Sequence, residues 1–146
     1  MKKIMMMLAL MLTLTTSFAF AGETINKQAL NAFQNEFAGA TDIAWKVSGN
    51  YYEVAFTIDH KRLAAFYDDR GNFVAVTHFI SSGELTNGLR KSLKRAYGNA
   101  YWVSDLFEVT AGDETSYYVT IENADSRVVL RSINGSHWAL YQKIDK

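Results

Sequence analysis

The three histidines are the side chains that titrate near neutral pH, so they are the first candidates for catalysis or metal binding. They are His60, His78 and His137. No two of them have the spacing of a His-x-x-x-His metal motif, and each falls in or beside an expected strand or turn. We therefore interpret them as polar positions on a solvated sheet face, and the sequence predicts no metal site.

Other patterns typical of enzyme chemistry are missing from the sequence. It has no Gly-x-Ser-x-Gly elbow, phosphate-binding loop, dinucleotide-binding motif or EF-hand, and it has no cysteine for thiol chemistry or disulfides. Asp68 and Asp69 are the densest carboxylate pair, but they lie in an expected turn, where aspartate usually caps its own backbone. The sequence thus predicts a protein without catalytic residues, cofactor or metal, and not an enzyme.

Aromatic side chains are the one feature that suggests a function. Tyr51 and Tyr52 are neighbours in an expected strand, so they point to opposite faces of a sheet. If helices cover only one face, the other presents side-chain types that are enriched at protein interfaces. Alternation places Tyr51, Tyr141 and His137 on the helix-free face as candidate partner-binding residues, and Trp138 in the core. Cross-strand aromatic pairing that only stabilises the sheet is the alternative.

Two helices are expected where apolar residues recur three and four positions apart. The first carries Leu30, Phe33 and Phe37, and the second carries Leu89, Leu93, Ala96 and Tyr97. The start of the second helix has two interpretations. Ser81 and Glu84 match a capping box, but Gly88 is unfavourable inside a helix, so a start at Thr86 is the alternative.

After each helix the apolar period changes to two, which predicts strands. The expected strands lie near residues 43–48, 52–58, 62–67, 73–79, 101–110, 117–122, 127–133 and 137–143. The gaps between them are short, which predicts antiparallel hairpins. Asn134-Gly135 matches the type I′ turn. On the second strand, alternation predicts that Tyr52, Val54, Phe56 and Ile58 lie under a helix.

These elements predict an α+β fold in which two tandem repeats of a helix followed by antiparallel strands form a two-layer fold, with the helices on one face of the sheet. The repeats span about 22–80 and 84–146. Neither half is long enough for a substantial core of its own. Residues 22–146 are therefore expected to form a single domain.

The first 21 residues resemble an export signal. Lys2 and Lys3 precede an apolar run, and Ala19-Phe20-Ala21 has the small-x-small pattern of a cleavage site. An uncleaved membrane anchor is the alternative. We expect cleavage after Ala21, no stable membrane insertion afterwards, and a periplasmic or secreted location.

The net charge of the chain does not indicate which class of partner it binds. The chain has 15 basic and 15 acidic residues, and two of the basic ones lie in the expected signal peptide, so no global field favours nucleic acid. The second helix carries a local basic cluster of Arg90, Lys91, Lys94 and Arg95, interpreted as a solvated face rather than an anion site. The expected partner is an envelope or extracellular protein whose identity is unknown.

Three segments of the first half carry a family resemblance: Ile43-Ala44-Trp45-Lys46, Tyr52-Glu53-Val54-Ala55-Phe56, and the run from Ala65 to Phe73 with its Asp-x-x-Gly turn. They resemble the PepSY-like, beta-lactamase-inhibitor-protein-like (BLIP-like) secreted proteins of Bacteroidetes. The second half departs from that pattern, because it has no proline before its helix and has Ile133-Asn134-Gly135 in place of the Asp-x-x-Gly turn.

The resemblance implies a two-layer fold, an envelope location and no established activity. It transfers no binding residues, because the family has no partner-contact motif to match. Together with the aromatic residues, it favours a non-enzymatic binding module, such as a protein or peptidase inhibitor, acting through the helix-free sheet face. The alternatives are a small-molecule or ion-binding envelope protein with a site between the repeats, and a weak hydrolase.

Overall fold

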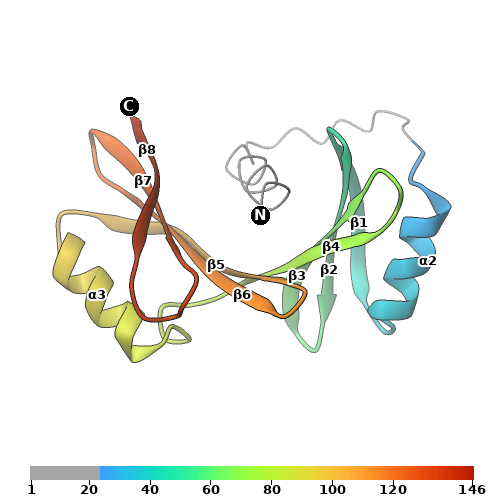
Figure 1. Cartoon of the computed structure of the whole chain (residues 1–146), viewed down its shortest axis with the longest axis horizontal. Helices are drawn as coiled ribbons and strands as arrows, with labels where there is room; N and C mark the ends of the chain where they lie inside the picture. The colour runs from blue at the N-terminus through green and yellow to red at the C-terminus, as the bar shows by residue number, and fades with distance from the viewer. Residues whose placement is uncertain (1–23) are drawn as a thin grey trace. The chain divides into compact units, whose positions relative to one another are not determined.

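The computed structural model describes residues 24–146, in which two helices and eight strands follow one another along the chain (Figure 1). The expected signal peptide and its cleavage site lie outside the described residues. The helices are α2 (Lys27–Glu36) and α3 (Asn87–Tyr97). The strands are β1 (Thr41–Ser48), β2 (Tyr51–Ile58), β3 (Lys61–Asp68), β4 (Phe73–Phe79), β5 (Trp102–Ala111), β6 (Glu114–Glu122), β7 (Ser126–Ser132) and β8 (Ala139–Asp145).

The strands form one eight-stranded antiparallel sheet whose hydrogen-bonded order, β1 to β8, is the order of the sequence. The expected α+β class, with two helix-then-strand repeats in a two-layer fold, is therefore wrong. The chain has a β-rich fold, because the described residues contain only two short helices, of 10 and 11 residues, beside eight strands.

The described residues divide into two compact units, an N-terminal unit that ends at Val76 and a C-terminal unit of Thr77–Lys146. In the N-terminal unit, Ala29 and Phe33 of α2 pack against buried Val54 and Phe56 of β2. The Phe33 and Phe56 rings meet edge-on with centroids 5.1 Å apart. Tyr52 and Ile58 pack against the same cluster, which confirms that this side of β2 faces a helix.

The turn after β3 is built by Asp68 and Gly71. The Asp68 carboxylate accepts hydrogen bonds from the backbone N–H groups of Arg70 and Asn72, at 3.0 and 2.8 Å, as expected for an aspartate in a turn. Gly71 has a φ of 84° and lies against the first turn of α2, where a Cβ atom would come within 2.6 Å of the Ala29 nitrogen. Only glycine combines that dihedral angle with so close an approach.

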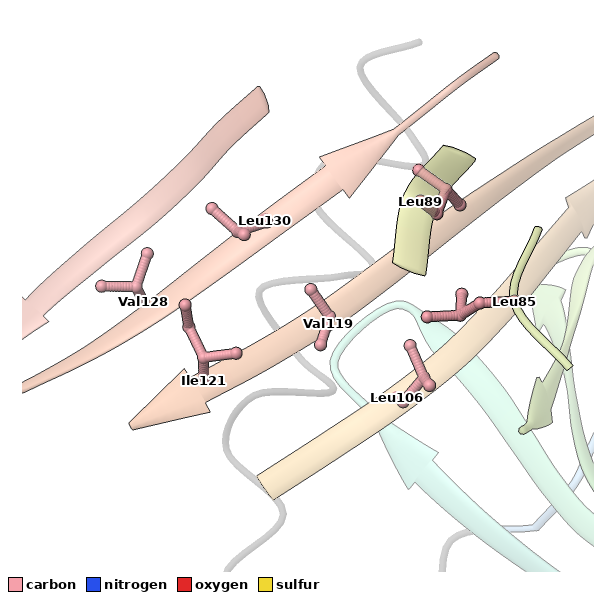
Figure 2. Close-up of a cluster of buried hydrophobic side chains, with 7 residues drawn as sticks. All are labelled: Leu85, Leu89, Leu106, Val119, Ile121, Val128 and Leu130. Carbon is pink, nitrogen blue, oxygen red and sulfur yellow. The ribbon is translucent and has the colours of Figure 1, made fainter. Parts of the chain in front are cut away.

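In the C-terminal unit, α3 packs on one face of strands β5 to β7. Figure 2 shows the cluster, in which Leu89 of the helix lies with six further buried side chains: Leu85, Leu106, Val119, Ile121, Val128 and Leu130. Thr86 caps the helix by accepting a hydrogen bond from the Leu89 N–H at 3.2 Å, so the later of the two expected starts is confirmed. The Glu84 carboxylate still bonds Ser81, but in a turn that precedes the helix.

The type I′ turn is not where the sequence placed it. Among the described non-glycine residues, φ is positive at Asp42, Asp59 and His60, so Asn134 does not adopt the conformation that a type I′ turn requires. The Asn134 side chain instead accepts hydrogen bonds from the N–H groups of Ser136 and His137 in a longer connection. The two-residue turn with both φ angles positive is Asp59-His60, between β2 and β3.

Candidate functional site

The candidate site is the face of strands β5 to β8 opposite α3, which we call the helix-free face. Val119 and Ile121 of β6 belong to the cluster under α3, so the alternating residues Tyr118, Thr120 and Glu122 point to the other side. Tyr118 pairs in register with Phe107 of β5 and with Arg131 of β7. Residues paired directly across strands share a face, so these neighbours also belong to the helix-free face.

A row of four aromatic rings crosses this face. Phe79 meets Phe107 edge-on at 6.0 Å, Phe107 stacks on Tyr118 at 5.5 Å with 16° between the planes, and Tyr118 meets Tyr141 edge-on at 5.7 Å. The two inner rings are buried, whereas Phe79 is 48% exposed and Tyr141 is half-buried. The inner rings therefore hold the outer rings in place, and the outer rings remain accessible to a partner.

Arg131 completes the aromatic row. Its guanidinium carbon lies 5.5 Å from the centre of the Tyr118 ring, and its Nη2 donates a hydrogen bond to the Ser116 hydroxyl at 3.4 Å. Burial raises the pKa of Tyr118, and the charge of Arg131 only partly opposes this effect. Tyr118 is therefore a neutral phenol at physiological pH, and the cation beside it remains available to a negatively charged partner group.

A charged cluster lies at the far end of the same face. The Glu122 carboxylate accepts hydrogen bonds from Lys146 Nζ at 2.8 Å and Arg127 Nε at 3.0 Å. The bond from Lys146 is the main reason that the pKa of Glu122 falls to about 2. Lys146 Nζ also lies 5.4 Å from the centre of the Trp102 ring, whose residue is 55% exposed. Two cations thus surround one carboxylate next to an exposed tryptophan.

The three expected partner-binding residues occupy different surroundings. Tyr141 joins the aromatic row, whereas His137 is exposed in the connection before β8 and belongs to no strand. Tyr51 lies in the N-terminal unit, where it is the half-buried first residue of β2 and pairs with Ser48 and Asp68. Trp138, expected in the core, packs against the α3 cluster and donates a hydrogen bond from Nε1 to the Leu89 carbonyl at 3.0 Å.

Sequence reasoning missed Phe79, Phe107, Tyr118 and Arg131 as a connected set. Alternation from the buried residues of β6 could have placed Tyr118 on the helix-free face, and strand register would then have supplied Phe107 and Arg131. Alternation along the last strand predicted Tyr141 on this face, but the structure places Tyr141 at an irregular position of β8. The β7–β8 register shifts between Val129 and Leu130, so Tyr141 is the extra residue of a bulge, which simple alternation does not describe.

Glu53 is a carboxylate of the N-terminal unit whose pKa departs from its usual value. Burial raises its pKa, and the charge of Lys46 partly opposes the rise. Glu53 lies opposite Phe66 of β3, a residue that is buried on the side of the strand away from α2. Its two cross-strand neighbours are therefore Lys46 of β1 and Phe66 of β3, a cation and an apolar ring rather than a second carboxylate for acid–base catalysis.

Residues 24–146 contain neither a metal-binding cluster nor a membrane-spanning helix. The part of the chain that the structure describes contains no group of three or more histidine, cysteine, aspartate or glutamate side chains placed to hold a metal ion. Neither described helix is long and apolar enough to cross a membrane.

Comparisons with known proteins identify the fold. No family model and no curated protein matches the sequence. Solved structures do match: a BLIP-like protein from Bacteroides fragilis has 21% identity and a TM-score of 0.70, with 84% of this chain and 87% of that chain covered. A DUF2874 family protein from Bacteroides ovatus has 17% identity and a TM-score of 0.73, with 85% and 89% covered.

A candidate periplasmic protein from Bacteroides eggerthii has 9% identity and a TM-score of 0.73, with 84% of this chain and 90% of that chain covered. At such identities the likeness concerns the fold and leaves the activity open. The PepSY-like part of the resemblance stays a prediction. The chain has the fold of the BLIP-like and DUF2874 proteins of Bacteroides.

Proposed function

We propose that this protein is a non-enzymatic binding module that recognises another protein through the helix-free face of its C-terminal unit. The observation that carries the proposal is the aromatic row from Phe79 to Tyr141, with buried inner rings and accessible outer rings. Aromatic side chains held rigidly by their neighbours lose little entropy on binding, and they are common at the centres of interfaces.

The charged groups of this face favour a partner that contributes both apolar and acidic side chains. Arg131 has no carboxylate partner among the described residues, and Glu122 is shared by Arg127 and Lys146. A carboxylate from the partner would meet the positive charge of Arg131 beside the Tyr118 ring. Inhibition of an envelope enzyme is the form of binding that we propose, and a periplasmic or secreted location follows from the expected signal peptide.

The experiment is capture of envelope proteins by the purified protein and by two variants. Phe79→Ser with Tyr141→Ala removes the accessible ends of the row, whereas Ile133→Ser removes an apolar side chain that is 69% exposed and lies outside it. We expect a captured protein to disappear with the first variant and to remain with the second. The captured protein is then assayed for loss of its own activity when the complex forms. Equal capture by both variants would show that binding uses another surface.

A further inference from the structure

The C-terminal unit contains a second site, on the α3 side of the sheet. A pocket of about 250 Å³ opens between the end of α3 and the first residues of β5. Its floor is Ile121 of β6, which is 1% exposed, and its walls include Leu93, Tyr101 and Val103. Val103 is 45% exposed, so the pocket leaves apolar surface in contact with water.

One wall of the pocket is held rigid by two tyrosines. The rings of Tyr97 and Tyr101 meet edge-on at 5.5 Å with 89° between their planes, and both belong to the pocket lining. Both side chains are half-buried and pack against the core cluster under α3. The pocket is therefore formed by side chains that the core already orders, as expected of a binding site for a small ligand.

The rim of the pocket is positive. Arg90 and Lys94 of α3 line it, and α3 contains no acidic residue. Neither cation takes part in an ion pair within residues 24–146, and the Arg90 guanidinium bonds the neutral side chain of Asn87 at 2.7 Å. Lys94 lies in the last turn, where the helix dipole favours a cation, but Arg90 lies near the first turn, where the dipole opposes one. The helix dipole therefore does not explain Arg90.

We propose that this pocket binds a monoacyl anion, with the acid group of the ligand against Arg90 and Lys94 and the acyl chain along Leu93, Val103 and Ile121. The apolar walls select a hydrocarbon chain, and the unpaired cations at the rim select a negative head group. This inference is independent of the proposed function, because the pocket lies on the α3 side of the sheet and shares no residue with the aromatic row.

The test is calorimetric titration of the purified protein with decanoate and, separately, with decanol. We expect saturable binding of decanoate at one site. The Arg90→Gln, Lys94→Gln double variant should bind decanoate about tenfold or more weakly, because charge-assisted hydrogen bonds are lost, and should bind decanol as the original protein does. Val103→Asn should weaken both ligands.

Lys91→Gln is the matched control, because it removes a cation from the same helix at a residue outside the pocket lining. It should leave decanoate binding unchanged. The proposal is wrong if decanoate does not saturate, if the double variant binds it normally, or if Lys91→Gln weakens it equally. Sedimentation with phosphatidylglycerol vesicles tests the alternative that Arg90 and Lys94 bind a membrane surface. Binding to the vesicles without binding to decanoate would support that alternative and contradict the proposal.

Discussion

The Tyr141 ring of β8 meets the Tyr118 ring of β6 edge-on, with centroids 5.7 Å apart, although β7 lies between the two strands. The bulge in β8 supplies this geometry, because Tyr141 is the residue without a direct partner in β7. The contact links an accessible tyrosine to a buried one. It connects the candidate binding surface to the packing of the sheet.

Removing the two tyrosines should therefore have different effects. Tyr118→Ala is expected to lower the free energy of unfolding by about 3 to 5 kcal/mol, because it empties a buried site. Tyr141→Ala should lower it by about 1 kcal/mol through loss of the ring pair. Urea unfolding of both single variants and of the double variant measures the coupling, and strictly additive losses would show that the rings do not interact.

Trp138→Ala should lower the free energy of unfolding by about 3 kcal/mol, since the indole packs against the α3 cluster. Trp138→Phe keeps an aromatic ring but removes the hydrogen bond to the Leu89 carbonyl. It should therefore lower the free energy of unfolding of the original protein by about 1 kcal/mol. Thermal and urea unfolding measure both changes. If Trp138→Ala left the stability unchanged, the indole would have no part in the core.

Stability at low pH should depend on Glu122. Its pKa falls from the usual 4.5 to about 2 in the folded protein, so its carboxylate stabilises the fold when ionised. That contribution is complete above about pH 4.5 and is lost as the pH falls toward 2. Urea unfolding across this range should show a smaller pH dependence in Glu122→Gln. Asp145→Asn is the control, because the Lys143–Asp145 pair is exposed and should contribute little.

Gly71→Ala should destabilise the protein more than Gly39→Ala. Both glycines have positive φ, 84° and 89°, so both variants lose roughly 1 kcal/mol to backbone strain. Only at Gly71 would the new methyl group also meet the backbone of α2, whereas no atom lies within 4 Å at Gly39. The difference between the urea unfolding midpoints of the two variants measures the destabilisation caused by the contact with α2. Equal losses would mean that the loop moves away from α2 without cost.

Export should remove the first 21 residues. N-terminal sequencing of the protein recovered from the envelope or the medium is expected to begin at Gly22. Recovery of a membrane-bound form that keeps Met1 would contradict both the cleavage and the expected location.

Local patterns in the sequence determined where most elements lie. The change of apolar period from 3.6 to two located both helices and all eight strands, with strand ends shifted by a few residues. Alternation identified the side of β2 that faces a helix, and the unfavourable Gly88 suggested the Thr86 start of α3. These features depend on residues a few positions apart, which is the range over which dihedral preferences, caps and alternation act.

Tertiary structure decided the features that depend on residues far apart in the chain. The expected α+β repeats gave way to a β-rich fold, because the eight strands join one sheet and only two short helices lie beside them among the described residues. The bulge that turns Tyr141 toward Tyr118 arose from packing across three strands, and no local pattern specifies packing between strands.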